Sequence, residues 1–392
     1  MTIPLPPKAV RPDYAGGGIV NLMASLLRAQ GADSTLPEAD CLPASRLGRR
    51  QVLLLLDGLG AEHLASAVPD GFLHKHLVGR LTSVYPSATA AAIPSFLSAE
   101  PPLRHGFTGW YTWLRELAMT VTVLPYISRA GFVYDENTGK SPRQLARLLP
   151  FADRIRAPMV QVQPRSIAFS AFSRDFAGRA RTIPYKSLND MIKRIRRAVS
   201  GLTDRGVVYA YWPDYDHLAH AHGVMSDATV AHMHLLDEAV ANLAADLAGQ
   251  SVDLIVCSDH GFGNCPPEQQ FLFTDAFPAL AVMTRQSLTG EPRAPFAYLR
   301  QGAVHDFMQA AESELAGIAT PVTADALLQA GLLGTGEAHP WIRDRIGDVA
   351  LLMHAHHVIF DPLPGDSAPN MIGHHGGLSR DEMSVPVVHC RC

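Results

Sequence analysis

The segment from Tyr211 to Val224, YWPDYDHLAHAHGV, concentrates aspartates and histidines directly after an apolar run. Asp216 and His220 stand four residues apart, a spacing that puts both side chains on one face of a helical turn. A carboxylate and an imidazole on one face are suitable ligands for zinc or manganese. The spacing therefore predicts that Asp216 and His220 bind a divalent metal ion, with Asp214 as the alternative to Asp216.

His217 and His222 belong to the same segment but are rotated away from that face of the helix. Gly223 follows His222 and indicates a turn at this point. We expect both histidines either to support the ligands from outside or to lie in solvent.

Two other apolar segments end in residues of the same chemical kind. LLLLDG ends in Asp57, and LIVCSDHG ends in Asp259 and His260. A single aspartate at such a position is explained equally well as the cap of the next helix. Three segments that bring carboxylates to one edge of a sheet indicate a cation between them, because the negative charges repel each other.

A metal held by Asp216 and His220 needs a third protein ligand. The late segment MIGHHGGLSRDE offers His374 and His375. The glycines beside them indicate that the backbone approaches a ligand closely. A His-Gly turn on the surface is the alternative explanation.

Residues 81–100, LTSVYPSATAAAIPSFLSAE, offer a nucleophile. A Pro-Ser-Ala-Thr turn leads into alanine-rich sequence, which predicts a helix that begins near Thr89. The free N–H groups and the positive dipole end of such a helix favour a phosphoryl group at this point. The alternative is that Thr89 only caps the helix. Pro94 has to lie in the first turn or kink the helix.

Short, continuously apolar segments precede these polar residues and are typical of strands buried on both faces of a parallel sheet. They are residues 51–58, 157–163, 206–212, 252–261 and 348–354. A helical pattern at residues 16–31 precedes them, and others lie between them, among these the segment from Asp227 to Gly249, which has Ser226 as its N-cap. The pattern predicts an α/β fold with a doubly wound, mostly parallel sheet flanked by helices.

The expected catalytic core consists of residues 1–263 and 371–392. Residues 264–370 are rich in proline and glycine and separate SDHGF from IGHHGGLS. We expect them to form an inserted cap or lid region, because long loops gather at the carboxyl ends of such strands. The alternative is that part of this region belongs to the core.

The composition limits the classes of function. The chain has 392 residues, of which 47% are hydrophobic and 18% charged, as in globular proteins. The formal net charge is −4 without a long basic block, which argues against nucleic acid as the main partner. No apolar run reaches the roughly 18 residues of a membrane span, and the first residues lack a signal-peptide pattern. We expect a cytoplasmic protein, and the oligomeric state stays open.

The order of these motifs resembles the alkaline phosphatase superfamily, and within it the branch of type I phosphodiesterases and nucleotide pyrophosphatases. The resemblance extends from about Gln51 to Val388 and includes YPSAT, DxxxH, SDHG and a late HG. It implies an alkaline phosphatase-like core and two divalent metal ions, zinc in preference to manganese. The implied ligands of one ion are Asp216, His220 and His375, and those of the other are Asp57, Asp259 and His260, with the Thr89 hydroxyl between metal and substrate.

His375 is preferred to His374 because the ligand in the family directly precedes the glycine. Two positions depart from the family: Ala90 follows the nucleophile where an aromatic residue is usual, and Trp110 replaces an asparagine that contacts a phosphate oxygen. We expect Ala90 and Trp110 to contact the substrate. These two departures leave open whether the protein is specific for nucleotides.

The resemblance implies a hydrolase of small phosphate esters that forms a phosphothreonine on Thr89. Phosphodiesters are expected in preference to phosphomonoesters or phosphonate esters. A phosphomutase and a non-catalytic metal-binding protein are the alternatives from other classes. Hydrolysis of a simple aryl phosphodiester distinguishes the hydrolase from both.

Overall fold

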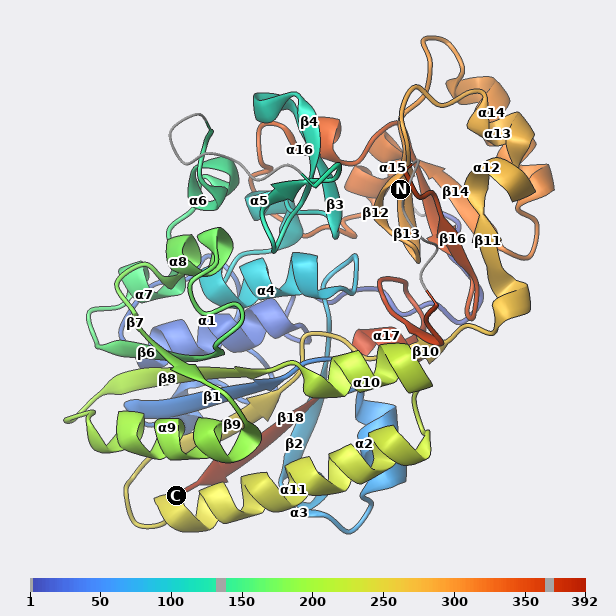
Figure 1. Cartoon of the computed structure of the whole chain (residues 1–392). Coiled ribbons are helices and arrows are strands. Elements are labelled where there is room, and N and C mark those ends of the chain that lie inside the picture. Colours follow the sequence, from blue (N-terminus) through green and yellow to red (C-terminus); the bar gives the residue numbers. More distant parts are fainter. Residues whose placement is uncertain (1–2, 132–138, 364–369) are drawn as a thin grey trace.

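The computed structural model describes residues 3–131, 139–363 and 370–392 (Figure 1). Its first sheet has the strand order β2-β18-β9-β1-β8-β6-β7. These strands are β1 (Arg50–Leu56), β2 (Leu77–Thr82), β6 (Met159–Pro164), β7 (Arg181–Tyr185), β8 (Gly206–Trp212), β9 (Asp253–Cys257) and β18 (Ser384–Arg391). The pairs β1–β8, β1–β9, β6–β8 and β6–β7 are parallel, and only the pairs with β18 are antiparallel. The predicted α/β fold with a mostly parallel sheet is confirmed.

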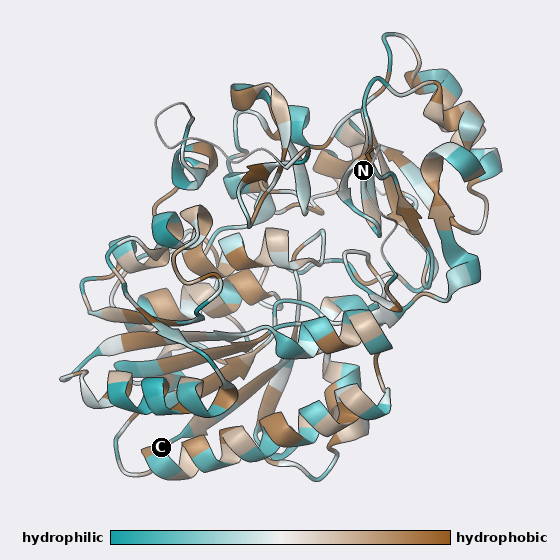
Figure 2. Cartoon of the chain, in the orientation of Figure 1, coloured by the Kyte–Doolittle hydropathy of each residue, from teal (hydrophilic) through white to brown (hydrophobic). Residues whose placement is uncertain are grey.

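Helices cover both faces of this sheet, which explains why its strands are continuously apolar (Figure 1). The main helices are α1 (Ile19–Ala29), α4 (Thr89–Ser98), α9 (Leu188–Ser200) and α11 (Asp227–Leu247). Leu53 and Leu55 of β1 pack in the core beneath α1 and α4. Val52 and Leu54 pack in the core beneath α9 and α11. Figure 2 shows hydrophobic strands, and hydrophilic residues along the outer faces of α9 and α11.

The predicted helices at residues 16–31 and 227–249 are present as α1 and α11. The N-cap of α11 is Ser226, as predicted, and its side chain accepts a hydrogen bond from the backbone N–H of Thr229. No helix among the described residues is both long enough and apolar enough to span a lipid bilayer.

The apolar segment 348–354 forms β15 (Val349–Met353), but its expected place in the parallel sheet is wrong. β15 pairs antiparallel with β13 (Ala294–Ala297) and β14 (Ala319–Thr323) in a second sheet. All residues of β15 are buried, because cores lie on both of its faces. Burial on two faces makes an antiparallel strand as continuously apolar as a parallel one.

The second sheet has the order β14-β15-β13-β12-β3-β4-β5. Its other strands are β3 (Tyr111–Leu114), β4 (Met119–Thr122), β5 (Ile127–Ser128) and β12 (Thr289–Glu291). β12 pairs with β3 through Gly290 and Tyr111, so residues 111–128 share this sheet with strands from 289–353. The description of residues 264–370 as a cap or lid stays a prediction.

Candidate active site

Three neighbouring strands of the first sheet carry the predicted acidic residues to one edge. Asp57 follows β1, and its backbone N–H donates to Trp212 O at the end of β8. Asp216 lies on α10 (Asp214–His222), which begins two residues after β8. Asp259 follows β9 on the other side of β1. The carboxyl ends of parallel strands thus bring the three carboxylates together, as expected for a site in an open α/β sheet.

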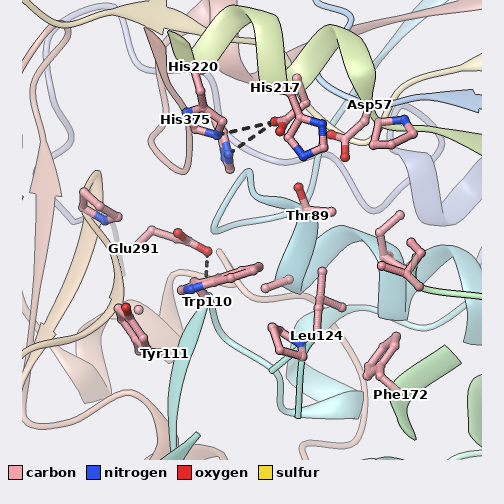
Figure 3. Close-up of a pocket in the computed structure, with 18 of the residues that line it drawn as sticks. Asp57, Thr89, Trp110, Tyr111, Leu124, Phe172, His217, His220, Glu291 and His375 are labelled. Carbon is pink, nitrogen blue, oxygen red and sulfur yellow. Dashed lines mark hydrogen bonds and ion pairs between the residues drawn. The ribbon is translucent and has the colours of Figure 1, made fainter. Parts of the chain in front are cut away.

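The first cluster consists of Asp216, His220 and His375, whose ligand atoms all lie within 4.8 Å of one another. His220 Nε2 is 3.5 Å and His375 Nε2 3.8 Å from Asp216 Oδ1 (Figure 3). The spacing of four residues does place Asp216 and His220 on one face of α10. His375 enters from the loop after β17 (Gly373–His374).

The second cluster consists of Asp57, Asp259 and His260, again with ligand atoms within 4.8 Å of one another. His260 Nε2 lies 3.4 Å from Asp57 Oδ1 and 3.5 Å from Asp259 Oδ2. All three side chains are buried. The structure therefore brings together the same two sets of residues that the resemblance implied, although their binding of metal stays a prediction.

The three histidines present the same nitrogen to their clusters. Nδ1 of His220 lies 2.9 Å from Gly373 O, that of His375 3.2 Å from Ser87 O, and that of His260 3.0 Å from Gly261 O. A carbonyl oxygen accepts a hydrogen bond, so each Nδ1 carries the proton and each Nε2 keeps its lone pair. Histidine ligands of metals are oriented in this way.

The carboxylates fit bound cations because the described residues leave them incompletely paired. Oδ1 of Asp57, Oδ1 of Asp216 and Oδ2 of Asp259 are buried and have no hydrogen-bond partner among the described residues. Burial first, and the neighbouring carboxylates second, raise the pKa of Asp57 and of Asp216 well above the ordinary value. A divalent ion at each cluster would balance these charges and use the unpaired oxygens.

The two imidazoles of the first cluster also fit a bound cation. Burial lowers the pKa of His220 to about 4, and burial together with His260 and His220 lowers the pKa of His375 well below its ordinary value. Neutral imidazoles are the form that binds metal.

Thr89 is the first residue of α4 and lies beside the second cluster. Its Oγ1 is 3.0 Å from His260 Nε2. The N-cap of α4 is Ala88, so the hydroxyl of Thr89 faces the cluster and does not cap the helix. Pro94 lies inside α4 and beyond its first turn. Of the two expectations for Pro94, the position in the first turn is therefore wrong.

The remaining candidates of the first motif lie outside both clusters. Asp214, His217 and His222 are exposed, and His217 lines the cavity described below. His374 is buried, and its Nε2 lies 3.3 Å from Met371 O. Of the two late histidines, His375 is therefore the one that the fold brings to the cluster.

Thr89 and both clusters border a cavity of about 900 Å³ between the two sheets. Ala90 and Trp110 line it, as expected of substrate contacts. The backbone N–H of Trp110 donates to Glu291 Oε1 at 2.6 Å (Figure 3). Figure 3 shows Thr89 at the centre, the histidines on one side of it, and Glu291 and Trp110 on another.

Tyr211 and Glu291 border the site without having been predicted. The Tyr211 hydroxyl donates to Asp57 Oδ2. Tyr211 alternates with Tyr209 along β8, and this period of two marks a common face toward the cavity. Glu291 is buried, which raises its pKa to about 8. A lone glutamate between Gly290 and Pro292 carries no signal of this kind in the sequence.

A buried ion pair holds the loop that carries His375. Arg293 Nη2 lies 2.7 Å from Glu382 Oε2, and Glu382 Oε1 accepts the backbone N–H of Gly377 at 2.8 Å. Gly376, between His375 and Gly377, has a φ of +116°, and a Cβ there would lie 2.9 Å from Glu291 Cβ. Glycine is required at this position because the backbone passes so close to β12.

The chain is similar to a known protein family and to several solved structures. A sequence model of the type I phosphodiesterase/nucleotide pyrophosphatase family matches residues 51–378. No curated protein matches the sequence. Among solved structures, murine ectonucleotide pyrophosphatase/phosphodiesterase 5 has a TM-score of 0.64 at 16% identity, over 87% of this chain and 88% of that chain.

Two related structures show the same likeness. An inactive threonine-to-alanine variant of the murine protein, in complex with AMP, has a TM-score of 0.64 at 15% identity, over 87% of this chain and 88% of that chain. The human counterpart has a TM-score of 0.63 at 14% identity, over 87% of each chain. At these identities the structural likeness concerns the fold.

Proposed function

The chain belongs to the type I phosphodiesterase/nucleotide pyrophosphatase family of the alkaline phosphatase superfamily, and we propose that it hydrolyses small phosphate esters, diesters in preference to monoesters, with Thr89 as the nucleophile. The observation that carries this proposal is the Thr89 hydroxyl, which lies 3.0 Å from His260 Nε2 of the second cluster. Family membership supports phosphodiester hydrolysis, and the AMP complex of the murine relative supports a phosphate ester as ligand.

The proposed metal ligands are the two clusters of the site. Asp216, His220 and His375 would hold one divalent ion, and Asp57, Asp259 and His260 the other, with zinc preferred because the ligands are nitrogen and carboxylate oxygen. Ions bound there would supply positive charge to the reacting oxygens and favour an ionised hydroxyl.

Thr89 performs the covalent step in this proposal. Its Oγ1 forms a bond to phosphorus while the bond from phosphorus to the leaving oxygen breaks, and the proton of the hydroxyl passes through solvent to the leaving group. The first N–H groups of α4, including that of Ala90, lie at the positive end of the helix dipole and favour the phosphoryl charge. Water then attacks phosphorus, releases the phosphate product and restores the Thr89 hydroxyl.

Tyr211 and Ser87 orient the groups around the nucleophile. The Tyr211 hydroxyl donates to one oxygen of Asp57, which leaves the other oxygen toward His260. Ser87 accepts a hydrogen bond from His375 Nδ1 through its backbone carbonyl. Because Ser87 stands two residues before Thr89, this contact ties the His375 loop to the start of α4.

A substrate screen with metal analysis tests the proposal. Purified protein should contain close to two divalent ions per chain and hydrolyse bis(4-nitrophenyl) phosphate faster than 4-nitrophenyl phosphate, and a chelator should abolish turnover. His220→Ala should lose metal and turnover, whereas the matched variant His217→Ala should lose much less, because His217 lies outside the clusters. Equal losses in the two variants, or full activity of metal-free protein, would contradict the proposal.

A further inference from the structure

The cavity beside Thr89 has an apolar wall that runs along one face of α4. Ile93 and Leu97 follow Thr89 at intervals of four residues, so the three side chains lie in one row, and both line the cavity. Eight residues of helix correspond to about 12 Å, which is the approximate length of the row. Leu124 and Phe172 line the same side, opposite Glu291 (Figure 3).

The polar groups on this side of the cavity are uncharged. Gln161, Gln163 and Tyr209 project from the first sheet into the lining. The Nε2 atom of Gln161 is buried without a hydrogen-bond partner among the described residues. Neutral side chains do not offset the cost of removing a charged substituent from water.

The other side of the cavity is also poor in groups that could pair a second phosphate. Glu291 and Asp361 line it, and a carboxyl group supplies no positive charge in either protonation state. Arg129 is the only lysine or arginine in the lining among the described residues. Its guanidinium already stacks over the Tyr111 ring at 4.2 Å and donates to Leu288 O at 2.5 Å.

The lining is therefore poor in cations, and the sequence of residues 132–138 and 364–369 contains no lysine or arginine. Large apolar side chains also stand at exposed positions of the lining. Trp110 (37% exposed), Ile167 (38%) and Met371 (37%) line the cavity and are among the exposed large hydrophobic side chains. Such exposed apolar groups around a hollow mark a binding site for an apolar ligand.

We infer that the natural substrates are monoanionic phosphodiesters with one uncharged, apolar alkyl or aryl substituent, which lies against Ile93, Leu97, Leu124 and Phe172. This inference rests on the proposed function and narrows it to a substrate class. Esters with a second phosphate, such as nucleoside triphosphates, are disfavoured because the cavity would desolvate several extra negative charges and offers them only Arg129, which already contacts Tyr111 and Leu288. Specificity here comes from the cost of an unpaired charge as well as from apolar contact.

A homologous series of 4-nitrophenyl alkyl phosphates tests the apolar wall. From the methyl to the butyl and octyl esters, kcat/KM should rise by about fourfold for each methylene that reaches the wall. In parallel, the 4-nitrophenyl ester of thymidine 5′-phosphate should be cleaved faster than thymidine 5′-triphosphate, although both release the same nucleotide.

Substitutions of Leu124 provide matched variants, because this half-buried residue lies in the turn after β4 and tolerates change better than the buried Leu97. Leu124→Lys adds a cation to the wall, so it should lower the octyl-to-methyl ratio and raise the relative turnover of the triphosphate. Leu124→Met keeps the wall apolar and should keep both ratios. Calorimetry on Thr89→Ala protein gives a readout without turnover, in which octyl phosphate should bind more tightly than methyl phosphate.

The outcomes separate the inference from the function on which it rests. Turnover of the esters with equal rates for methyl and octyl, or a preference of the native protein for the triphosphate, would overturn the substrate class alone. Failure to cleave any of the esters would overturn the proposed hydrolase, and the substrate class with it. If Leu124→Lys and Leu124→Met changed the ratios alike, the wall would not be the binding surface.

Discussion

Removal of the Thr89 hydroxyl distinguishes whether Thr89 is a nucleophile or only a structural residue of the helix. In the structure, Ala88 is the N-cap of α4 and the hydroxyl faces His260 Nε2, so Thr89→Ala removes no hydrogen bond of the helix. Alanine also has the higher helix propensity, so the free energy of unfolding should change by less than about 0.7 kcal/mol. Turnover should fall by about 10⁴-fold or more, as when other nucleophiles are removed. That loss corresponds to about 5.5 kcal/mol of transition-state stabilisation.

The assay measures three quantities on one preparation: turnover of bis(4-nitrophenyl) phosphate, bound metal, and thermal stability. Metal content should survive in Thr89→Ala, because carboxylates and imidazoles make up both clusters. Thr89→Ser is the matched control, since it keeps the oxygen and should keep part of the rate. Acid quenching of the native protein during turnover should trap a 4-nitrophenyl phosphoryl group on Thr89, because only one of the two nitrophenyl groups has left. A Thr89→Ala protein that stays active but loses the roughly 0.5–2 kcal/mol of stability expected from a lost cap would rule out Thr89 as the nucleophile.

Three other perturbations test the surroundings of the nucleophile. Tyr211→Phe removes the hydrogen bond to Asp57 and should weaken metal affinity by about 10- to 100-fold, as measured by competition with a chelator; unchanged affinity would exclude an orienting role. Removal of metal from the native protein should lower its melting temperature, because no cation then balances the negative charge of the buried carboxylates. Glu382→Gln leaves Arg293 buried with its charge unpaired, which should cost about 3–5 kcal/mol in chemical denaturation. Burial raises the pKa of Glu382, but Arg293 outweighs it and holds this pKa below the ordinary value. The stabilisation by the ion pair is therefore complete above about pH 4.3, the pKa of an unfolded glutamate, and is lost as pH falls through the folded-state pKa. Glu382→Gln should lack that loss in acid, and an identical acid profile in both proteins would contradict it.

Most of the ligand residues could be predicted because they stand next to a strong local pattern, whereas their division into two clusters came from the family resemblance. Asp57 and Asp259 follow continuously apolar strands, and parallel neighbours end at the same edge of a sheet. The interval between Asp216 and His220 needs only the helical repeat. His375 was different, because local sequence did not distinguish it from His374. The structure distinguishes them by position: His374 is buried in β17, whereas His375 follows β17 and lies next to Asp216.

The second sheet could not be predicted in the same way. Its strands are short, and β3 pairs with β12 through Tyr111 and Gly290, residues far apart in the sequence, which no local pattern reveals. Burial on both faces made β15 indistinguishable from a strand of the parallel sheet. Glu291 belongs to the site only because this sheet brings β12 next to Trp110. Residues that reach a site through distant pairing are therefore those that sequence reasoning misses.

The position of β18 has a consequence for the order in which the chain acquires its fold during synthesis. β18 lies between β2 and β9, and its residues are the last to leave the ribosome among those of the first sheet. Until then, β2 has no partner strand and the apolar edge of β9 is open, a state that invites pairing with other chains. His375 also emerges late. Until it has emerged, the nascent protein lacks both a complete first metal cluster and the complete sheet. We expect a chain stopped before Ser384 to aggregate even though it contains every residue of both clusters.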